Sequence, residues 1–256
     1  MIKEDIKFEN SVVFEGMTSI RSIIKGTESK YNDRVIEKIL FDKAKLKKIS
    51  KDVGYLRAVS EKNEFELVES NTEEIEKLTL GSSHGGLVAI AKERTIPYLS
   101  DECDIAQGGF YCMIQGIEDP YNLGYSLRSL YACGCDGIIL PERNWMSAAG
   151  VVARSSAGAS EMLPMYKSDA ITCADIFHSL GYKIVCADER TDNVLGECEL
   201  KKPILLIVGG EKRGISKELL EKTDMLVKID YAREFRASLS AASATTMFAY
   251  EIMRQN

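Results

Sequence analysis

The feature that most constrains the fold is a five-residue apolar run, Ile204–Val208, followed at once by Gly209-Gly-Glu-Lys-Arg-Gly-Ile-Ser216. The run predicts a buried strand. A buried strand that opens into a glycine-rich turn is how α/β proteins bring backbone N–H groups to a ligand. We therefore predict an α/β fold with a ligand-binding loop at this point. A helix-capping turn without a ligand is the alternative interpretation.

Two common nucleotide-binding loops are excluded by the same residues. Gly209 and Gly214 have the spacing of a P-loop, but Ile215 stands where that loop needs its phosphate-binding lysine. Gly209, Gly210 and Gly214 do not form the G-x-G-x-x-G pattern of dinucleotide-binding proteins either. A nucleotide triphosphatase is therefore not expected.

Two further segments carry comparable signals. An apolar strand, Phe110–Ile114, leads through Asp119-Pro-Tyr-Asn-Leu-Gly-Tyr-Ser-Leu-Arg128 into a predicted helix that ends near Cys133-Gly134. Near the C-terminus, Ala237-Ser-Leu-Ser-Ala-Ala-Ser-Ala244 begins a helix whose small residues allow close approach of a ligand or another backbone. We expect these loops to form one site together with the glycine-rich segment.

In order and spacing, the three segments resemble the three motifs of the SpoU/TrmH branch of the SPOUT methyltransferases, which transfer a methyl group from S-adenosylmethionine to a ribose 2′-hydroxyl of RNA. Arg154-Ser-Ser-Ala-Gly-Ala159 is similar to that family's small-residue segment between its first two motifs. The resemblance implies an α/β catalytic domain whose C-terminal chain forms a deep trefoil knot around the cofactor, a rare exception to unknotted topology. It also implies a homodimer, with the first-motif helix and the C-terminal helix at the interface.

The resemblance further implies roles for single residues. The implied catalytic residues are Arg128, Asn122, Glu211, Ser238 and Ser240. The implied cofactor-binding residues are Gly209, Gly210, Ile229, Leu239 and Ala187. Because a guanidinium stays protonated in proteins, we expect Arg128 to grip the target phosphate and donate toward the 2′-oxygen rather than act as a base. A surface ion pair is the alternative for Arg128, and an exposed carboxylate near a helix N-terminus is the alternative for Glu211.

The third motif departs from the family pattern. Ile229-Asp-Tyr231 stands where the family has Ile-Pro-Met, and Ser240 stands at the position of an asparagine. The interval from Ile229 to Leu239 is also one residue longer than usual. A serine hydroxyl offers one donor where the amide offers two. A non-catalytic RNA-binding or assembly protein on the same scaffold therefore stays open.

The first hundred residues are predicted to form a separate unit. A proline and a polar cluster interrupt the apolar pattern, which suggests a domain at 1–96, a linker at 97–108 and a catalytic domain at 109–256. Strand-like runs at 34–41 and 86–91 alternate with helical stretches at 16–24 and 52–61. This small α/β module resembles the ribosomal-protein-like RNA-binding domain that often precedes the catalytic domain. His84, beside a glycine where the family has glutamine, is a candidate RNA contact, with a turn histidine bonded to local backbone as the alternative.

Charge argues against an RNA substrate, since the formal net charge is −6. Residues 1–100, however, carry 17 basic and 17 acidic residues, so the whole deficit lies in residues 101–256. A local basic run comprises Lys43, Lys45, Lys47, Lys48 and Lys51. It predicts a patch for a phosphate backbone, with a solvated helix surface as the alternative. The acidic balance keeps open a third hypothesis, an α/β enzyme that uses another adenosyl or nucleotide ligand on a small substrate.

The remaining composition argues against metal sites and membrane spans. Seven cysteines without a C-x-x-C pair, beside only two histidines, are a poor zinc set and are expected to be reduced thiols in the core. No apolar run approaches the roughly 18 residues of a membrane span, and the charged residues at the start of the sequence are not expected to form a signal peptide. We expect a cytoplasmic protein. The sequence does not choose between transfer and ribosomal RNA.

Overall fold

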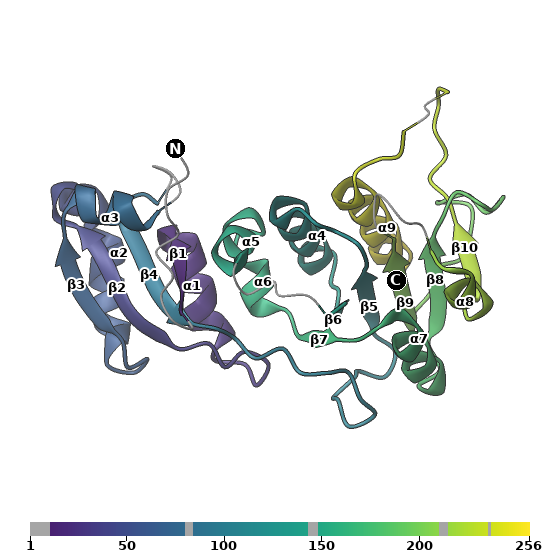
Figure 1. Cartoon of the computed structure of the whole chain (residues 1–256), viewed down its shortest axis with the longest axis horizontal. Coiled ribbons are helices and arrows are strands. Elements are labelled where there is room, and N and C mark those ends of the chain that lie inside the picture. Colours follow the sequence, from purple (N-terminus) through teal and green to yellow (C-terminus); the bar gives the residue numbers. More distant parts are fainter. Residues whose placement is uncertain (1–10, 80–83, 143–147, 210–214, 235–236) are drawn as a thin grey trace. The chain divides into compact units, whose positions relative to one another are not determined.

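The computed structural model describes residues 11–79, 84–142, 148–209, 215–234 and 237–256 (Figure 1). The chain divides into two compact units, one of residues 1–95 with 145–162 and one of residues 96–144 with 163–256. Within the described ranges, no helix is both long enough and apolar enough to cross a membrane.

The first unit is built on a four-stranded sheet in the order β1-β4-β2-β3, in which β4 is antiparallel to β1 and β2, and β3 is parallel to β2. Its strands are β1 (Ser11–Glu15), β2 (Ile36–Asp42), β3 (Glu66–Ser70) and β4 (Leu87–Lys92). Its helices before residue 95 are α1 (Gly16–Gly26), η1 (Lys43–Lys45), α2 (Leu46–Ser60) and α3 (Thr72–Leu78). The helix predicted at 52–61 begins earlier, at Leu46, because Ile49, Val53 and Leu56 form one buried stripe along it.

Helices α5 (Ala149–Ser155) and α6 (Ala159–Met162) belong to this first unit, and not to the second domain in which the sequence analysis placed them. Their small residues let backbones meet. A Cβ at Gly150 would collide with the Val13 carbonyl oxygen, and a Cβ at Gly158, whose φ is +86°, would collide with Ser22. The small-residue segment therefore serves close packing on β1 and α1.

A buried charge network also fixes α6 to the unit. Glu161 is 3% exposed, and its carboxylate accepts hydrogen bonds from Arg34 Nε (2.8 Å), Arg34 Nη2 (3.2 Å) and Asn32 Nδ2 (3.0 Å). Arg94 Nη1 donates to the Ser160 carbonyl oxygen at 2.8 Å. Burial alone would raise the pKa of Glu161, but the charges of Arg34 and Arg94 and the hydrogen bonds it accepts hold that pKa below its ordinary value.

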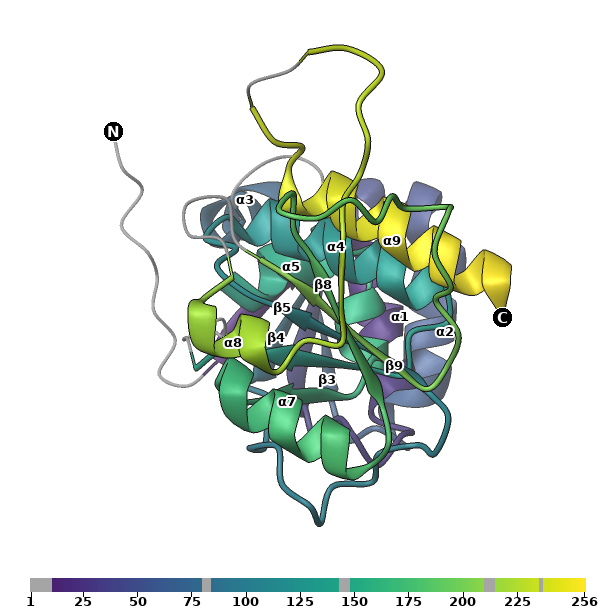
Figure 2. The same ribbon diagram turned by 90° about the vertical axis from the view of Figure 1, so that its right-hand side faces the viewer.

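The second unit has a six-stranded sheet of parallel pairs in the order β10-β8-β9-β5-β6-β7. Its strands are β5 (Phe110–Ile114), β6 (Gly137–Leu140), β7 (Met165–Lys167), β8 (Lys183–Ala187), β9 (Ile204–Val208) and β10 (Met225–Val227). In Figure 2, α4 (Pro120–Ala132) and α9 (Ala241–Gln255) lie on one side of these strands, and α7 (Ala170–Ser179) and α8 (Lys217–Glu221) on the other. The two predicted strands, β5 and β9, have the predicted bounds and pair with each other in the centre of the sheet.

The segment predicted as a linker, residues 97–108, packs on the second unit. Leu99 N donates to the Lys167 carbonyl oxygen and Lys167 N donates to the Pro97 carbonyl oxygen, both at 2.8 Å. The Tyr111 hydroxyl accepts from Ala106 N at 3.0 Å. Hydrogen bonds thus hold the segment against β7 and β5.

Candidate active site

A cavity of about 550 Å³ lies at the carboxyl ends of β8, β9 and β10. The last residue of each strand, Ala187, Val208 and Val227, lines it. In parallel α/β sheets, ligands bind outside the carboxyl ends of the strands, and this volume falls in the range of small-molecule sites.

The cavity is lined by both apolar and polar residues. The other apolar residues that line it are Ile215, Ile229, Leu239, Ala241, Ala244 and Phe248. The polar residues are Asp188, Glu189, Arg190, Lys228, Tyr231 and Ser238. Such a lining suits a ligand that has a flat apolar ring at one end and charged or hydroxyl groups at the other.

The structure brings together predicted residues of the second and third motifs and Ala187, the remaining residue predicted to bind the cofactor. Ala187, Gly209, Ile229, Leu239 and Ser238 all line the cavity, although they come from four separate segments. Gly210 and Glu211 lie outside the described residues.

Gly209 lines the cavity and is not among the described residues with positive φ. Among the described residues, a Cβ at Gly209 would come closest to Ile215 Cγ1, at 3.7 Å.

A hydrogen bond within the third motif spans the longer interval between Ile229 and Leu239. The Tyr231 hydroxyl accepts a hydrogen bond from Leu239 N at 3.2 Å, which ties together the two ends of the loop between β10 and α9. This loop projects from the rest of the unit (Figure 2). Ser240 caps α9 instead of lining the cavity, because its hydroxyl accepts from Ser243 N at 3.2 Å.

An arginine–aspartate pair that lines the cavity was missed by the sequence analysis. Asp188 Oδ1 accepts from Arg190 N (2.9 Å) and Nε (2.8 Å), and Asp188 Oδ2 accepts from Arg190 Nη2 (2.7 Å). Hydrogen bonds from Arg190 hold the pKa of Asp188 below its ordinary value. Three polar residues directly after an apolar strand, Asp188-Glu-Arg190, were the available signal.

The first motif forms the start of α4. Asp119 caps the helix by accepting from Tyr121 N (3.1 Å) and Asn122 N (3.3 Å). Asn122 is half-buried in the first turn, and Arg128 is exposed further along. Neither side chain is among the residues that line the cavity. That all three motifs form one site stays a prediction. Among the described residues, no ion pair of Arg128 is found, and both interpretations of this residue stay open.

In the first unit, the prediction that His84 contacts RNA is wrong. His84 is fully buried, and its Nδ1 accepts from Gly86 N at 3.1 Å, as in the alternative of a turn histidine bonded to local backbone. Burial lowers its pKa, so it stays neutral near pH 7.

Most of the lysines in the predicted patch are exposed, as both the RNA-binding interpretation and the solvated helix surface require. Lys43, Lys47, Lys48 and Lys51 are exposed, with the last three on α2. Lys45 differs, because it is only 34% exposed and its Nζ lies 3.8 Å from the buried carboxylate of Asp42. We find no cluster of histidine, cysteine or acidic side chains that could hold a metal ion among the described residues.

Comparison with known sequences identifies relatives of the second unit. The profile of the SpoU rRNA Methylase family matches residues 109–250. A putative TrmH family tRNA/rRNA methyltransferase from Staphylococcus saprophyticus is 30% identical over 144 residues, which are 56% of this chain and 57% of that protein. A Bacillus subtilis protein described in the same way, YacO, is 29% identical over 147 residues, 57% of this chain and 59% of its own. The chain thus spans less than two thirds of the length of these curated relatives.

Comparison of folds extends over nearly the whole chain. A crystal structure of an RNA 2′-O ribose methyltransferase matches with a TM-score of 0.79 and 22% identity, over 96% of this chain and 89% of that one. An AdoMet-bound rRNA methyltransferase from Sinorhizobium meliloti matches with a TM-score of 0.78 and 22% identity, over 96% of this chain and 87% of that one. The AdoMet complex of the SpoU methyltransferase AviRb from Streptomyces viridochromogenes matches with a TM-score of 0.76 and 21% identity, over 96% of this chain and 90% of that one. The chain therefore has the α/β fold of these methyltransferases.

Proposed function

The chain belongs to the SpoU rRNA Methylase family, and we propose that it transfers the methyl group of S-adenosylmethionine to a ribose 2′-hydroxyl of RNA in the cytoplasm. The observation that carries the proposal is the cavity at the carboxyl ends of β8, β9 and β10, where Gly209, Ile229 and Leu239 meet. Its apolar lining residues suit an adenine ring, and its polar lining residues suit a ribose and an amino-acid group. The cofactor would supply an already activated methyl group.

The residues of the chain then have to bind the ribose and to allow its 2′-hydroxyl proton to leave. A guanidinium stays protonated, so Arg128 binds the phosphate beside the target ribose and donates toward the 2′-oxygen, which stabilises the developing negative charge. The proton leaves to a substrate phosphate or to water. Ser238, which lines the cavity, contacts the ribose. The exposed lysines of α2 in the first unit bind the RNA backbone.

We also propose that two copies of the chain form a dimer through α4 and α9. The support is a face on which large apolar side chains of these two helices are 40–57% exposed: Tyr121, Tyr125, Tyr131, Met247, Tyr250 and Met253. Arg128 is one helical turn from Tyr125 and two turns from Tyr121. In such a dimer, Arg128 of one copy completes the cavity of the other.

The proposed trefoil knot has support at the C-terminus. After the loop that follows β10, α9 returns along the sheet, and its last residues bind the connection between β8 and β9. Gln255 Oε1 accepts from Leu200 N at 2.8 Å, and Asn256 Nδ2 donates to the Leu200 carbonyl oxygen at 3.0 Å. We propose that residues 188–203 form the loop through which the C-terminal chain passes.

Calorimetric titration with S-adenosylmethionine tests the cofactor assignment. We expect the wild-type chain to bind it, and Gly209→Val to bind more weakly without a lower melting temperature. Loss of binding and of stability together would make Gly209 structural only. RNA binding without cofactor binding by the wild-type chain would favour the second candidate, a non-catalytic RNA-binding protein, for which the altered third motif is the supporting observation.

A further inference from the structure

Arg190 connects two parts of the cavity wall that are far apart in sequence. It follows β8 by three residues and holds the Asp188 carboxylate through Nε and Nη2, at 2.8 and 2.7 Å. Its Nη2 also donates to the Ile215 carbonyl oxygen at 3.2 Å. All three residues line the cavity.

Ile215 is the described residue that follows 210–214, and it precedes α8. Its side chain is 5% exposed and belongs to the core of the second unit. Gly209, on the other side of the same loop, lies close to it. The bond from Arg190 to Ile215 therefore fixes where the far end of the glycine-rich segment stands relative to the end of β8.

Asp188 makes this connection stiff. Its side chain is only 7% exposed, whereas that of Arg190 is 51% exposed. A carboxylate with so little access to water needs a partner, and the planar guanidinium meets both of its oxygens while a further N–H bond reaches Ile215. A lysine has a single ammonium group and cannot reproduce this planar arrangement.

We propose that Arg190 is a positioning residue for the cofactor, which acts through Asp188 and Ile215 to hold the cavity wall in its binding shape. The inference rests on the proposed function, because it concerns affinity for S-adenosylmethionine. Arg190 acts before the chemical step, so its removal weakens binding and leaves turnover at saturating cofactor nearly unchanged.

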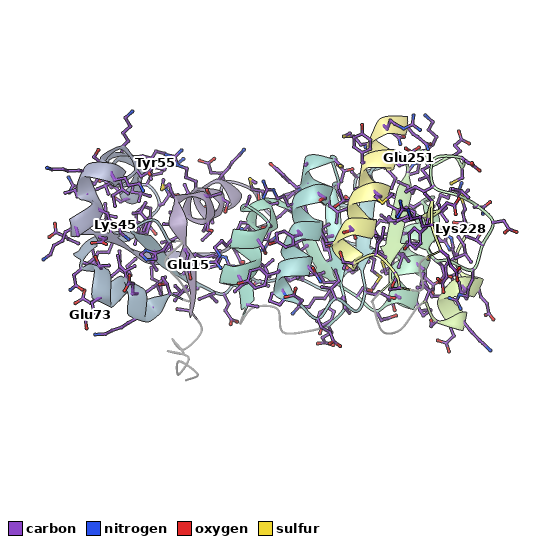
Figure 3. The ribbon with its side chains drawn as sticks, turned by 90° about the horizontal axis from the view of Figure 1, so that it is seen from above. Glu15, Lys45, Tyr55, Glu73, Lys228 and Glu251 are labelled. Atoms are coloured by element: carbon purple, nitrogen blue, oxygen red, sulfur yellow. The ribbon has the colours of Figure 1, made fainter. Side chains whose placement is uncertain are left out.

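The test compares two arginines that pair with a carboxylate in the same way and have similar exposure. Arg254 on α9 also binds a carboxylate through Nε and Nη2, that of Glu251. Glu251 is labelled in Figure 3. The Arg254 and Glu251 side chains are 55% and 11% exposed, close to the values for Arg190 and Asp188, but neither residue lines the cavity. Arg190→Met should raise the dissociation constant of S-adenosylmethionine at least about tenfold, which is about 1.4 kcal/mol, and Arg254→Met should leave it within about twofold.

Steady-state kinetics should show the same division, with a higher KM for the cofactor and a kcat within about threefold for Arg190→Met. Arg190→Lys should bind more weakly than wild type, since it keeps the charge but loses the paired geometry. If Arg190→Met fails to fold, Arg190→Lys decides the question.

An unchanged dissociation constant in Arg190→Met, or in Arg190→Lys where only that variant folds, overturns the inference while the proposed function stands. A wild-type chain that does not bind S-adenosylmethionine contradicts the proposed function itself. The two failures are therefore separable.

Discussion

Glu161→Gln should destabilise the first unit by about 3–5 kcal/mol, because it leaves the buried Arg34 guanidinium without its counter-charge. Arg34 and Glu161 are each 3% exposed, and Arg94, at 5%, adds a second positive charge beside them. The neutral amide also turns one of the accepting oxygens into a donor that faces other donors. Glu73→Gln is the matched control, since Glu73 projects from the surface (Figure 3) and its pair with Lys77 is 80% and 64% exposed. Glu73→Gln should lower the free energy of unfolding by less than about 1 kcal/mol.

The assay is urea unfolding of the full chain, with hydrogen exchange of peptides from residues 11–95 and 148–162 to isolate the first unit. The folded pKa of Glu161 lies below its ordinary value of 4.5, so its contribution is present above that pH and is lost as the pH falls through the folded pKa. Glu161→Gln should lose less stability over that acid range than wild type does. A cost below about 1 kcal/mol, or equal to that of Glu73→Gln, would refute the reasoning and the assignment of α6 to this unit.

Three further predictions address packing, RNA and the catalytic arginine. Gly158→Ala should lower the melting temperature, because φ is +86° and its Cβ would collide with Ser22. Gly54→Ala in α2 should be neutral or stabilising by up to about 1 kcal/mol, because among the described residues outside the adjacent helix backbone nothing lies within 4 Å of a Cβ there. Equal effects of the two substitutions would contradict the packing of α5 and α6 on α1. Replacing Lys47, Lys48 and Lys51 by Gln should weaken the salt dependence of RNA binding. The slope of the logarithm of the binding constant against the logarithm of the salt concentration should become shallower by up to about 0.7–0.9 for each lost phosphate contact, and an unchanged slope would remove the patch from the interface. Arg128→Lys should reduce methyl transfer equally across pH 7 to 10, whereas recovery of the rate at high pH would favour a titrating base.

The core of the fold could be predicted where local pattern decides structure. The strands Phe110–Ile114 and Ile204–Val208 are continuous apolar runs, and any environment that buries them must be a sheet interior or a similar core. The placement of 148–162 could not be predicted in this way. Small residues such as Gly150 and Gly158 show that another backbone comes close, but not which one.

For the site, too, some residues could be predicted from the sequence and others depend on packing. The motif resemblance located Gly209, Ile229 and Leu239, which meet in the cavity. It failed for His84, because burial of a side chain depends on packing that a motif does not encode. The contact from Arg190 to Ile215 joins residues 25 positions apart, and only the pairing of β8 with β9 brings them together.

The most direct test of the proposed function is transfer of labelled methyl from S-adenosylmethionine into transfer and ribosomal RNA that lack the modification, with the label mapped to ribose or base. The account predicts label at a ribose 2′-oxygen, detected as a nucleotide bond that resists alkaline cleavage, and loss of that label in Arg128→Ala. Label on a base, or no label from a chain that binds both RNA and cofactor, would contradict it.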